Sequence, residues 1–422
     1  MSNPQLSSNA ASALLATINE SPNTQHNSYV YSETDSITPQ TSMQWDNLES
    51  QSGTSASSQS VHFDINKNGY MTKLILGLRF HAVAGSASGK LCPDWVLNCI
   101  SEISISSGGR VIERHTRESL FAHISECPSY VKGAYAAGLG LSATATPVGS
   151  AAGATIDKDV FLNIPGFWEK NKTSLNTSFL QPLRVTVRFA NFANVTNAAD
   201  TVVTLDDAYT RAYVQYRNMQ DPVDAATIQS NYGDGLLSQL ITTYSQENPV
   251  TYKSSTTAVS KPMKMQLKET SCVESMYIML VENPASGSNE QTGRPLKLDH
   301  IEFKSNGNSY VNLPAELLQL YGTQSTHGSK GFGAANWDLT NSVEDGATKY
   351  VYKIDFGQGD TDRNELTNLL SFRELAAPEI IVKHTPDSTA TNKDVNLFVT
   401  YKRSELSNTV SSTGRFAIAL SN

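Results

Sequence analysis

Charged residues and long apolar runs are both scarce in this sequence. Of its 422 residues only 17% are charged, the formal net charge is −8, and lysine and arginine nowhere cluster into a basic arm. Such an arm is what neutralises a phosphate backbone, so we expect no direct contact with nucleic acid. No apolar run is long enough to span a membrane, and the N-terminus lacks a basic segment followed by an apolar one. We therefore expect a soluble protein made in the cytosol.

Cysteines and catalytic motifs are also few. Cys92, Cys99, Cys127 and Cys272 have spacings that match neither a zinc site nor a redox pair, and we expect reduced thiols. The short motifs of serine hydrolases, metalloproteases, P-loop proteins and dinucleotide-binding proteins are missing. The sequence therefore predicts no metal, no cofactor and no enzymatic activity.

Three features suggest chemistry at first sight and have simpler explanations. Asp206 and Asp207 are paired carboxylates, but adjacent residues usually point to opposite faces, so we expect a solvated loop. Residues 357–365 are acidic and contain glycine, yet they lack the ligand spacing of a calcium loop, which favours a turn between strands. His115 and His123 are interpreted as an accidental pair on a partly exposed helix.

Residues 1–58 are rich in Ser, Gln, Asn and Thr and contain few large apolar side chains. Such a composition buries too little surface to offset the entropy of ordering the chain, so we expect an extended N-terminal arm. Within it Leu14, Leu15 and Ile18 have helical spacing. They could form a short amphipathic helix that docks on a neighbouring molecule, or belong to a frayed terminus.

Four blocks of sequence recur in the same order, which indicates an internal duplication. Most read as short strands, and in the first of them apolar and polar residues alternate, as a half-buried strand requires. A helical pattern follows the second block in both copies, at residues 117–124 and 314–320. The matched blocks are residues 61–65 with 263–267, 103–111 with 301–311, 182–187 with 378–382, and 212–217 with 397–402.

About eight short strands per copy, with one helix in a fixed place, favour the jelly roll over an immunoglobulin-type sandwich. We therefore predict an all-β chain of two tandem eight-stranded jelly-roll sandwiches with short inter-strand helices. Residues 236–241 are helix-compatible and lie in the expected connector. The expected units are the arm at 1–58, a first roll at 59–220, a connector at 221–250, a second roll at 251–405 and a C-terminal tail at 406–422.

Over residues 60–404 this order of elements resembles the double jelly-roll major capsid proteins of tailless icosahedral double-stranded DNA viruses. Residues 102–112, with the helix that follows, are similar to the family's segment leading into its first inter-strand helix. The stretch VFLNIPGFW at 160–168, followed by the strand through residue 189, is similar to a second family motif. Residues 364–372, ahead of Pro378, resemble a third.

The resemblance implies a structural protein of the virion, made in the host cytosol. It implies a homotrimer, a hexon-like capsomer of pseudo-hexagonal outline that tiles the facets of an icosahedral capsid. Its partners would then be neighbouring capsomers, penton and minor capsid proteins, with an internal membrane as an option beneath the shell. The long irregular segments at 133–156 and 321–347 would face outward, and the arm would lie below or between capsomers.

Large aromatic side chains are the candidates for interface anchors, because they bury large areas. We select Phe167, Trp168, Tyr321 and Trp337. The Pro-Gly turn beside Phe167 and Trp168 is also compatible with a carbohydrate-stacking platform. A two-jelly-roll carbohydrate-active or glycan-binding protein is therefore the alternative function, and an assembly scaffold of the same fold also stays open.

Overall fold

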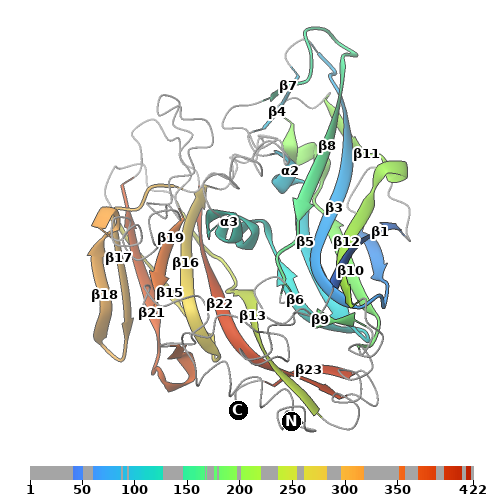
Figure 1. Cartoon of the computed structure of the whole chain (residues 1–422). Coiled ribbons are helices and arrows are strands. Elements are labelled where there is room, and N and C mark those ends of the chain that lie inside the picture. Colours follow the sequence, from blue (N-terminus) through green and yellow to red (C-terminus); the bar gives the residue numbers. More distant parts are fainter. Residues whose placement is uncertain are drawn as a thin grey trace, which may run out of the picture.

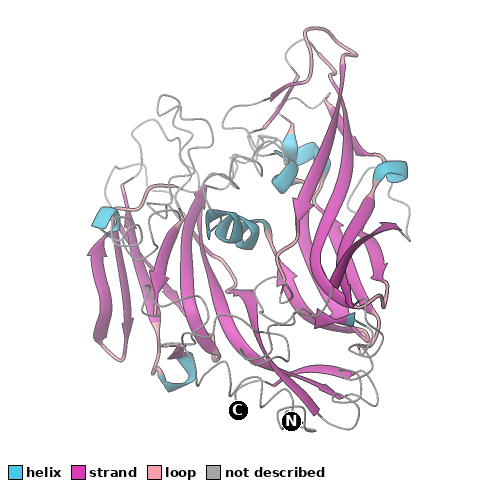
Figure 2. Ribbon diagram, in the orientation of Figure 1, coloured by secondary structure: helices cyan, strands magenta, loops and turns pink. Residues whose placement is uncertain are grey.

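Two β-sandwiches stand side by side with one helix between them (Figure 1). The first sandwich (blue to green) is followed by the second (yellow to red), and nearly all regular structure is strand (Figure 2). The computed structural model describes residues 41–50, 60–86, 89–92, 95–126, 146–166, 168, 175–177, 180–196, 201–219, 236–253, 261–282, 296–317, 351–356, 369–385, 394–410 and 415–419.

The first roll consists of two antiparallel sheets, which we call its large and small sheets. The large sheet has the order β1-β12-β3-β11, and β8 and β9 pair with β3. Its strands are β1 (Thr41–Glu49), β3 (Tyr70–Val83), β8 (Thr155–Asn163), β9 (Leu175–Asn176), β11 (Val202–Leu205) and β12 (Arg211–Met219). The small sheet contains β2 (Ser60–Ile65), β10 (Leu183–Phe189), β5 (Ile100–Ser107) and β6 (Arg110–His115), in that order. A separate ribbon pairs β4 (Lys90–Leu91) with β7 (Thr146–Pro147).

The second roll has the same plan. Its large sheet has the order β13-β22-β16-β19, with β14, β20 and β23 pairing alongside. These strands are β13 (Leu236–Gln246), β14 (Val250–Tyr252), β16 (Cys272–Glu282), β19 (Tyr352–Asp355), β20 (Leu370–Ser371), β22 (Val395–Val410) and β23 (Arg415–Ala419). The small sheet contains β15 (Lys261–Gln266), β21 (Glu379–His384), β17 (His300–Ser305) and β18 (Asn308–Pro314), in that order.

Helices are short and connect strands. Those named within the described residues are α2 (Trp95–Asn98), α3 (Arg117–Glu126) and the 3-10 turns η3 (Phe192–Val195), η4 (Asp207–Tyr209) and η6 (Phe372–Glu374). After β18, residues 315–317 are helical, and the rest of the second predicted helix lies outside the described residues. Within the described part of the chain, no helix has the length and apolarity needed to cross a bilayer.

The duplication predicted from the sequence is confirmed by the sheet topology. The order β2-β10-β5-β6 in the first roll returns as β15-β21-β17-β18 in the second. The hairpin turns match too, because both central residues have positive φ: Gly108 and Gly109 in one copy, Asn306 and Gly307 in the other. Positive φ at both positions is typical of tight hairpin turns, which favour Gly and Asn.

Three segments differ from the expectations, since pairing with a distant strand overrides local composition. β1 lies inside the stretch assigned to the arm, and all of its residues pair with β12. The segment expected to be helix-compatible, residues 236–241, is part of β13 and pairs with β22. β22 and β23 continue the sheet beyond residue 405, into the stretch assigned to the tail. The wider division into units stays a prediction.

Candidate functional site

The strongest contact between the rolls is a buried layer that we call the seam. It forms where the large sheet of the second roll meets α3 and β6 of the first roll. β16 is buried on both faces there. Met276, Ile278 and Leu280 pack into the core of the second roll, whereas the alternate residues Tyr277, Met279 and Val281 belong to the same buried cluster as the first roll.

The neighbouring strands of the second roll continue the seam. Phe398 on β22 and Val351, just before β19, also join the cluster of the first roll. From the first roll, α3 contributes four buried apolar side chains, and its contacts reach both β13 and β22. These side chains are Leu120, Phe121, Ala122 and Ile124.

The sequence contains a signal for the strand that is buried at the seam. Residues 276–281 read MYIMLV, an unbroken apolar run, and a strand buried on both faces loses the alternation of a half-buried strand. Alternation with polar residues returns in the corresponding strand of the first roll, where Lys73, Arg79 and His81 interrupt the apolar residues of β3.

Two histidines and a tyrosine meet in the seam where β13 lies against β6 and α3. Tyr244 on β13 is buried, and its ring lies 6.1 Å from the ring of His115 and 6.2 Å from that of His123. Both histidines are buried, so the expectation of an accidental pair on a partly exposed helix is wrong. The two side chains reach the same tyrosine because β6 leads directly into α3 against the second roll.

The buried carboxylate of Glu113 binds the backbone of β13, the edge strand of the second roll's large sheet. Glu113 Oε1 accepts a hydrogen bond from the backbone N–H of Tyr244 at 3.0 Å and lies 3.5 Å from Nε2 of His115. Burial lowers the pKa of His115 to about 4, against a smaller opposing effect from the backbone at Pro165. His115 is therefore neutral at neutral pH, and the seam contains no imidazolium at this position.

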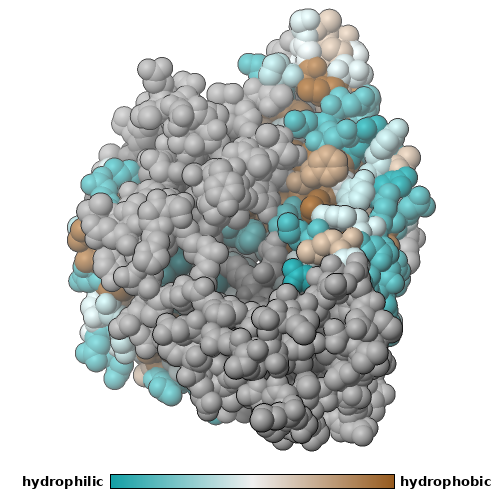
Figure 3. Space-filling model, viewed as in Figure 1, coloured by the Kyte–Doolittle hydropathy of each residue, from teal (hydrophilic) through white to brown (hydrophobic). Residues whose placement is uncertain are grey.

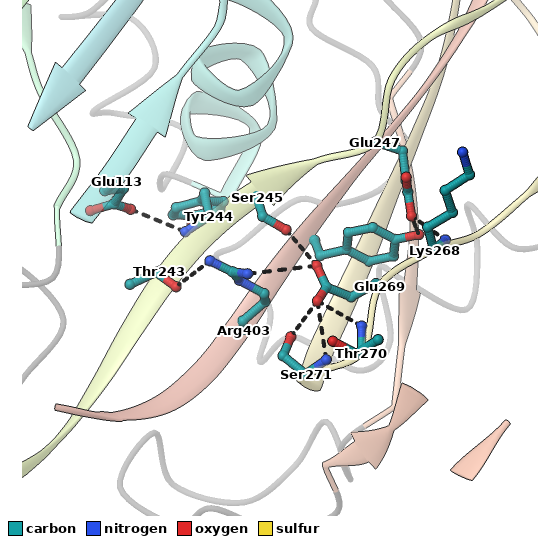
Figure 4. A network of polar contacts seen from close by, with 11 residues as sticks. Glu113, Thr243, Tyr244, Ser245, Glu247, Lys268, Glu269, Thr270, Ser271 and Arg403 are labelled. Atoms are coloured by element: carbon teal, nitrogen blue, oxygen red, sulfur yellow. Dashed lines mark hydrogen bonds and ion pairs between the residues drawn. The ribbon is translucent and has the colours of Figure 1, made fainter. Parts of the chain in front are cut away.

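A polar network around Glu269 fastens the strands of the second roll just below (Figure 4). Its Oε1 accepts hydrogen bonds from the backbone N–H groups of Thr270 and Ser271 at 2.9 and 3.1 Å, and from the Ser271 hydroxyl at 2.8 Å. Its Oε2 accepts one from the Ser245 hydroxyl at 2.6 Å and lies 3.7 Å from Arg403. One carboxylate thus ties β13, β22 and the turn before β16 together.

Arg403 and Tyr401 extend this network along β22. Arg403 donates to the Thr243 hydroxyl at 3.3 Å, and the Tyr401 hydroxyl donates to Glu247 at 3.2 Å. Burial, together with the carboxylates of Glu247 and Glu269, raises the pKa of Tyr401. Tyr401 therefore stays a neutral donor. The network is suited to holding strands in register, because each of these groups is engaged with another strand or turn.

The sequence-predicted anchors are not gathered at one site by the described residues. Trp168 is only 2% exposed and belongs to the core cluster of the first roll, so its ring is enclosed by the chain itself and is not an exposed anchor. Gly166 makes room for it, since a Cβ there would lie 2.5 Å from the indole ring. The remaining candidates lie outside the described residues: Phe167, Tyr321, Trp337, Leu14, Leu15 and Ile18.

The weaker chemical candidates have structural roles where they are described. Asp206 accepts a hydrogen bond from the N–H of Ala208 at 3.0 Å and so begins η4. Cys92, Cys99 and Cys272 are not in disulfide bonds, in line with the expectation of reduced thiols, and residues 357–365 and Cys127 lie outside the described part of the chain. Among the residues that are described, no group of three or more His, Cys, Asp or Glu is placed to hold a metal.

Comparisons with known proteins rest on structure. No protein-family model and no curated protein sequence matches this chain. The fold is similar to VP54 of the virus PBCV-1, with a TM-score of 0.66 and 11% identity over 93% of this chain and 99% of VP54. This chain has the double jelly-roll fold of viral major capsid proteins.

Two further capsid proteins match over nearly their whole length. The Faustovirus major capsid protein has a TM-score of 0.62 and 9% identity, covering 90% of this chain and 92% of that one. The mavirus major capsid protein has a TM-score of 0.57 and 10% identity, covering 94% of each chain. The double jelly roll inferred from the sequence is therefore confirmed, including its span over both rolls.

Proposed function

We propose that this chain is the major capsid protein of a double-stranded DNA virus and that three copies form its capsomer. The observation that carries the proposal is the pair of jelly rolls, whose small sheets share one strand order and which meet at the seam. The seam joins the rolls through buried apolar side chains from both. Two such sandwiches per chain give three chains a pseudo-hexagonal outline, and a hexagonal block tiles a flat facet.

The proposed role needs no catalytic group. The sandwiches supply stiff walls, and the large sheet of the second roll is packed on both faces at the seam. One contact, repeated between copies around a closed ring, then builds the assembly. Neighbouring capsomers would be the main partners, with penton and minor capsid proteins at other positions of the shell. The segments 133–156 and 321–347 are proposed to face outward, and an internal membrane is compatible with this arrangement.

The test measures the solution mass of the purified protein by light scattering, with negative-stain images of the same fraction. We expect a mass near three times the 45.8 kDa of the chain, and particles of hexagonal outline. A monomer at high concentration would contradict the proposal. Screening the same sample against a glycan array tests the alternative function, for which saturable binding to one glycan class would be the supporting result.

A further inference from the structure

The edge strand β1 is held differently from the other strands of its sheet. All nine of its residues pair with β12, and its other edge has no partner strand within the described part of the chain. None of the β1 side chains at residues 42–49 is buried. By contrast β13, which has the corresponding place in the second roll, buries Thr243 and Tyr244. β1 is therefore attached mainly through its main chain.

The pattern of side chains along β1 is the reverse of what a strand that covers a core requires. Asp46 pairs with Val214, which is fully buried, so Asp46 lies on the core side of the sheet. Met43 and Trp45 alternate with it and are 53% and 49% exposed. Apolar side chains are likewise scattered among hydrophilic ones over the first roll (Figure 3). Within β1, Leu48 packs partly against the core, so separating the strand exposes little additional apolar surface of β1.

Polar contacts fasten β1 to the turn between β2 and β3. Asp46 Oδ2 accepts hydrogen bonds from the side-chain amides of Asn66 at 3.2 Å and Asn68 at 2.8 Å, and we call these three residues the clasp. Gln44 donates to Asp46 Oδ1 at 3.1 Å and accepts a bond from Asn218 at 2.9 Å. All four bonds are exposed to water, which competes for the same groups, so each contributes little to holding β1 in place.

The link between β1 and β2 is long enough to carry β1 beyond its own sheet. It consists of the ten residues 50–59, which span at most about 35 Å when extended. The path from β1 to β11 across the same sheet is only about 14 Å. A β12 edge without β1 presents unpaired N–H and C=O groups, which favour pairing with another strand. The β1 segment of a second copy has the same sequence and therefore fits that edge in the same register.

We propose that β1 is a detachable strand, and that the β12 edge which it leaves takes the β1 segment of a second copy. Each exchange replaces a set of contacts by an identical set, so it needs no new interface and depends on how concentrated the copies are. The exchange goes beyond the proposed capsomer, which requires no strand to leave its own sheet. Where copies lie close together, as in an assembled shell, main-chain hydrogen bonds of the added strand link one chain to the next.

Hydrogen exchange of the full chain, followed by mass spectrometry, measures the detachment. We expect the amides of β1 to exchange about a hundredfold faster than those of β3, which is paired on both edges. Asp46→Ala removes both bonds of the clasp and should raise the exchange rate of β1 about tenfold more. The matched control is Asp157→Ala, which breaks an exposed pair with His81 in the same sheet and should leave β1 unchanged. Equal protection of β1 and β3 would overturn the detachment.

Disulfide formation between two single variants tests the exchange between copies. Trp45 and Gln215 pair directly across β1 and β12, a spacing that a disulfide can bridge. With oxidised glutathione as the oxidant, the double variant Trp45→Cys/Gln215→Cys should form an intrachain bond, which shows that both positions keep the native pairing. A mixture of Trp45→Cys with Gln215→Cys should give covalent dimers that a thiol reductant separates. Adding Asp46→Ala to the first variant should speed their formation about tenfold.

Lys73→Cys is the matched control for position. Lys73 on β3 pairs with Gln215 and so lies two strands away from Trp45, too far for a disulfide. Mixed with Trp45→Cys, it should give no dimer, and the unmodified protein reports on the native thiols. An intrachain bond in the double variant without dimers in the mixture would overturn the exchange, and so would equal dimer yields from Trp45→Cys alone. Dimers from a protein that never forms trimers would support the exchange and defeat the proposed capsomer.

Discussion

Replacing Glu269 by alanine should cost more stability than any comparable change at the surface. The side chain is 10% exposed and accepts four hydrogen bonds while facing Arg403. Removing one partner of a buried pair costs roughly 3–5 kcal/mol, and hydrogen bonds to a charged group contribute about 1.5–3 kcal/mol each, not additively. Because Arg403 keeps 17% of its side chain exposed and can be rehydrated, we expect a loss of about 3 kcal/mol.

Urea unfolding followed by circular dichroism measures this loss. Glu269→Gln retains an oxygen for the Thr270 and Ser271 bonds and removes only the charge, so about half the effect is expected. A double-mutant cycle with Arg403→Met should give a coupling energy of about 1–2 kcal/mol. A Glu269→Ala variant within about 0.5 kcal/mol of the unmodified protein would refute the assignment of this network as a fastener of the sheet, since that is the range of neutral surface changes.

The pH dependence of the same residue has a definite sign. Burial raises the pKa of Glu269, but the Ser245 hydroxyl, the Arg403 charge and the bonds from Ser271 together lower it below its ordinary value of 4.5. The ionised form is thus favoured in the folded state. Its contribution to stability is fully present above about pH 4.5 and is lost as the pH falls through the lowered pKa. Glu269→Gln should therefore show a shallower loss of stability below pH 4.5.

Three further results are expected. The free energy of unfolding should fall by about 3 kcal/mol between pH 6.5 and 4, because His115 binds a proton in the unfolded chain and stays neutral in the folded one. His115→Gln should remove this pH dependence, and a variant with the same pH dependence would contradict the prediction. Gly166→Ala places a Cβ 2.5 Å from the ring of Trp168 and should destabilise by about 1–3 kcal/mol in the same urea assay. Burial raises the pKa of Cys99, so mass-spectrometric labelling with iodoacetamide should modify the partly exposed Cys272 before Cys99. Labelling of Cys99 before Cys272 would show that the Cys99 site is open.

The duplicated architecture could be predicted because the evidence for it lies in residues that are close together in the sequence. Hairpin turns such as Gly108-Gly109 and Asn306-Gly307, and strands that open after Pro182 and Pro378, are written into short stretches of chain. β1 and β13 could not be recognised in this way. Their residues become strand only by pairing with β12 and β22, which lie far away along the chain.

The site was harder to predict than the fold for a related reason. Aromatic residues such as Trp168 serve core and interface equally well, and composition alone does not separate the two uses. The burial of His115 and His123 depends on the position of Tyr244, more than a hundred residues later. The apolar run at residues 276–281 was the one signal within the sequence that indicated a strand covered on both faces.

The outward residues of corresponding strands differ between the two rolls. β16 presents Tyr277, Met279 and Val281 to the seam, a buried and largely apolar set. β3 presents Arg79 and His81 on its outer face, each paired with an aspartate and partly exposed. In the proposed assembly, a monomer that stays dispersed before it meets its neighbours needs such a polar face, whereas the seam is buried within the folded chain. Making this face of β3 apolar, with Arg79→Val and His81→Val, should therefore promote association of chains before assembly and lower the yield of discrete capsomers.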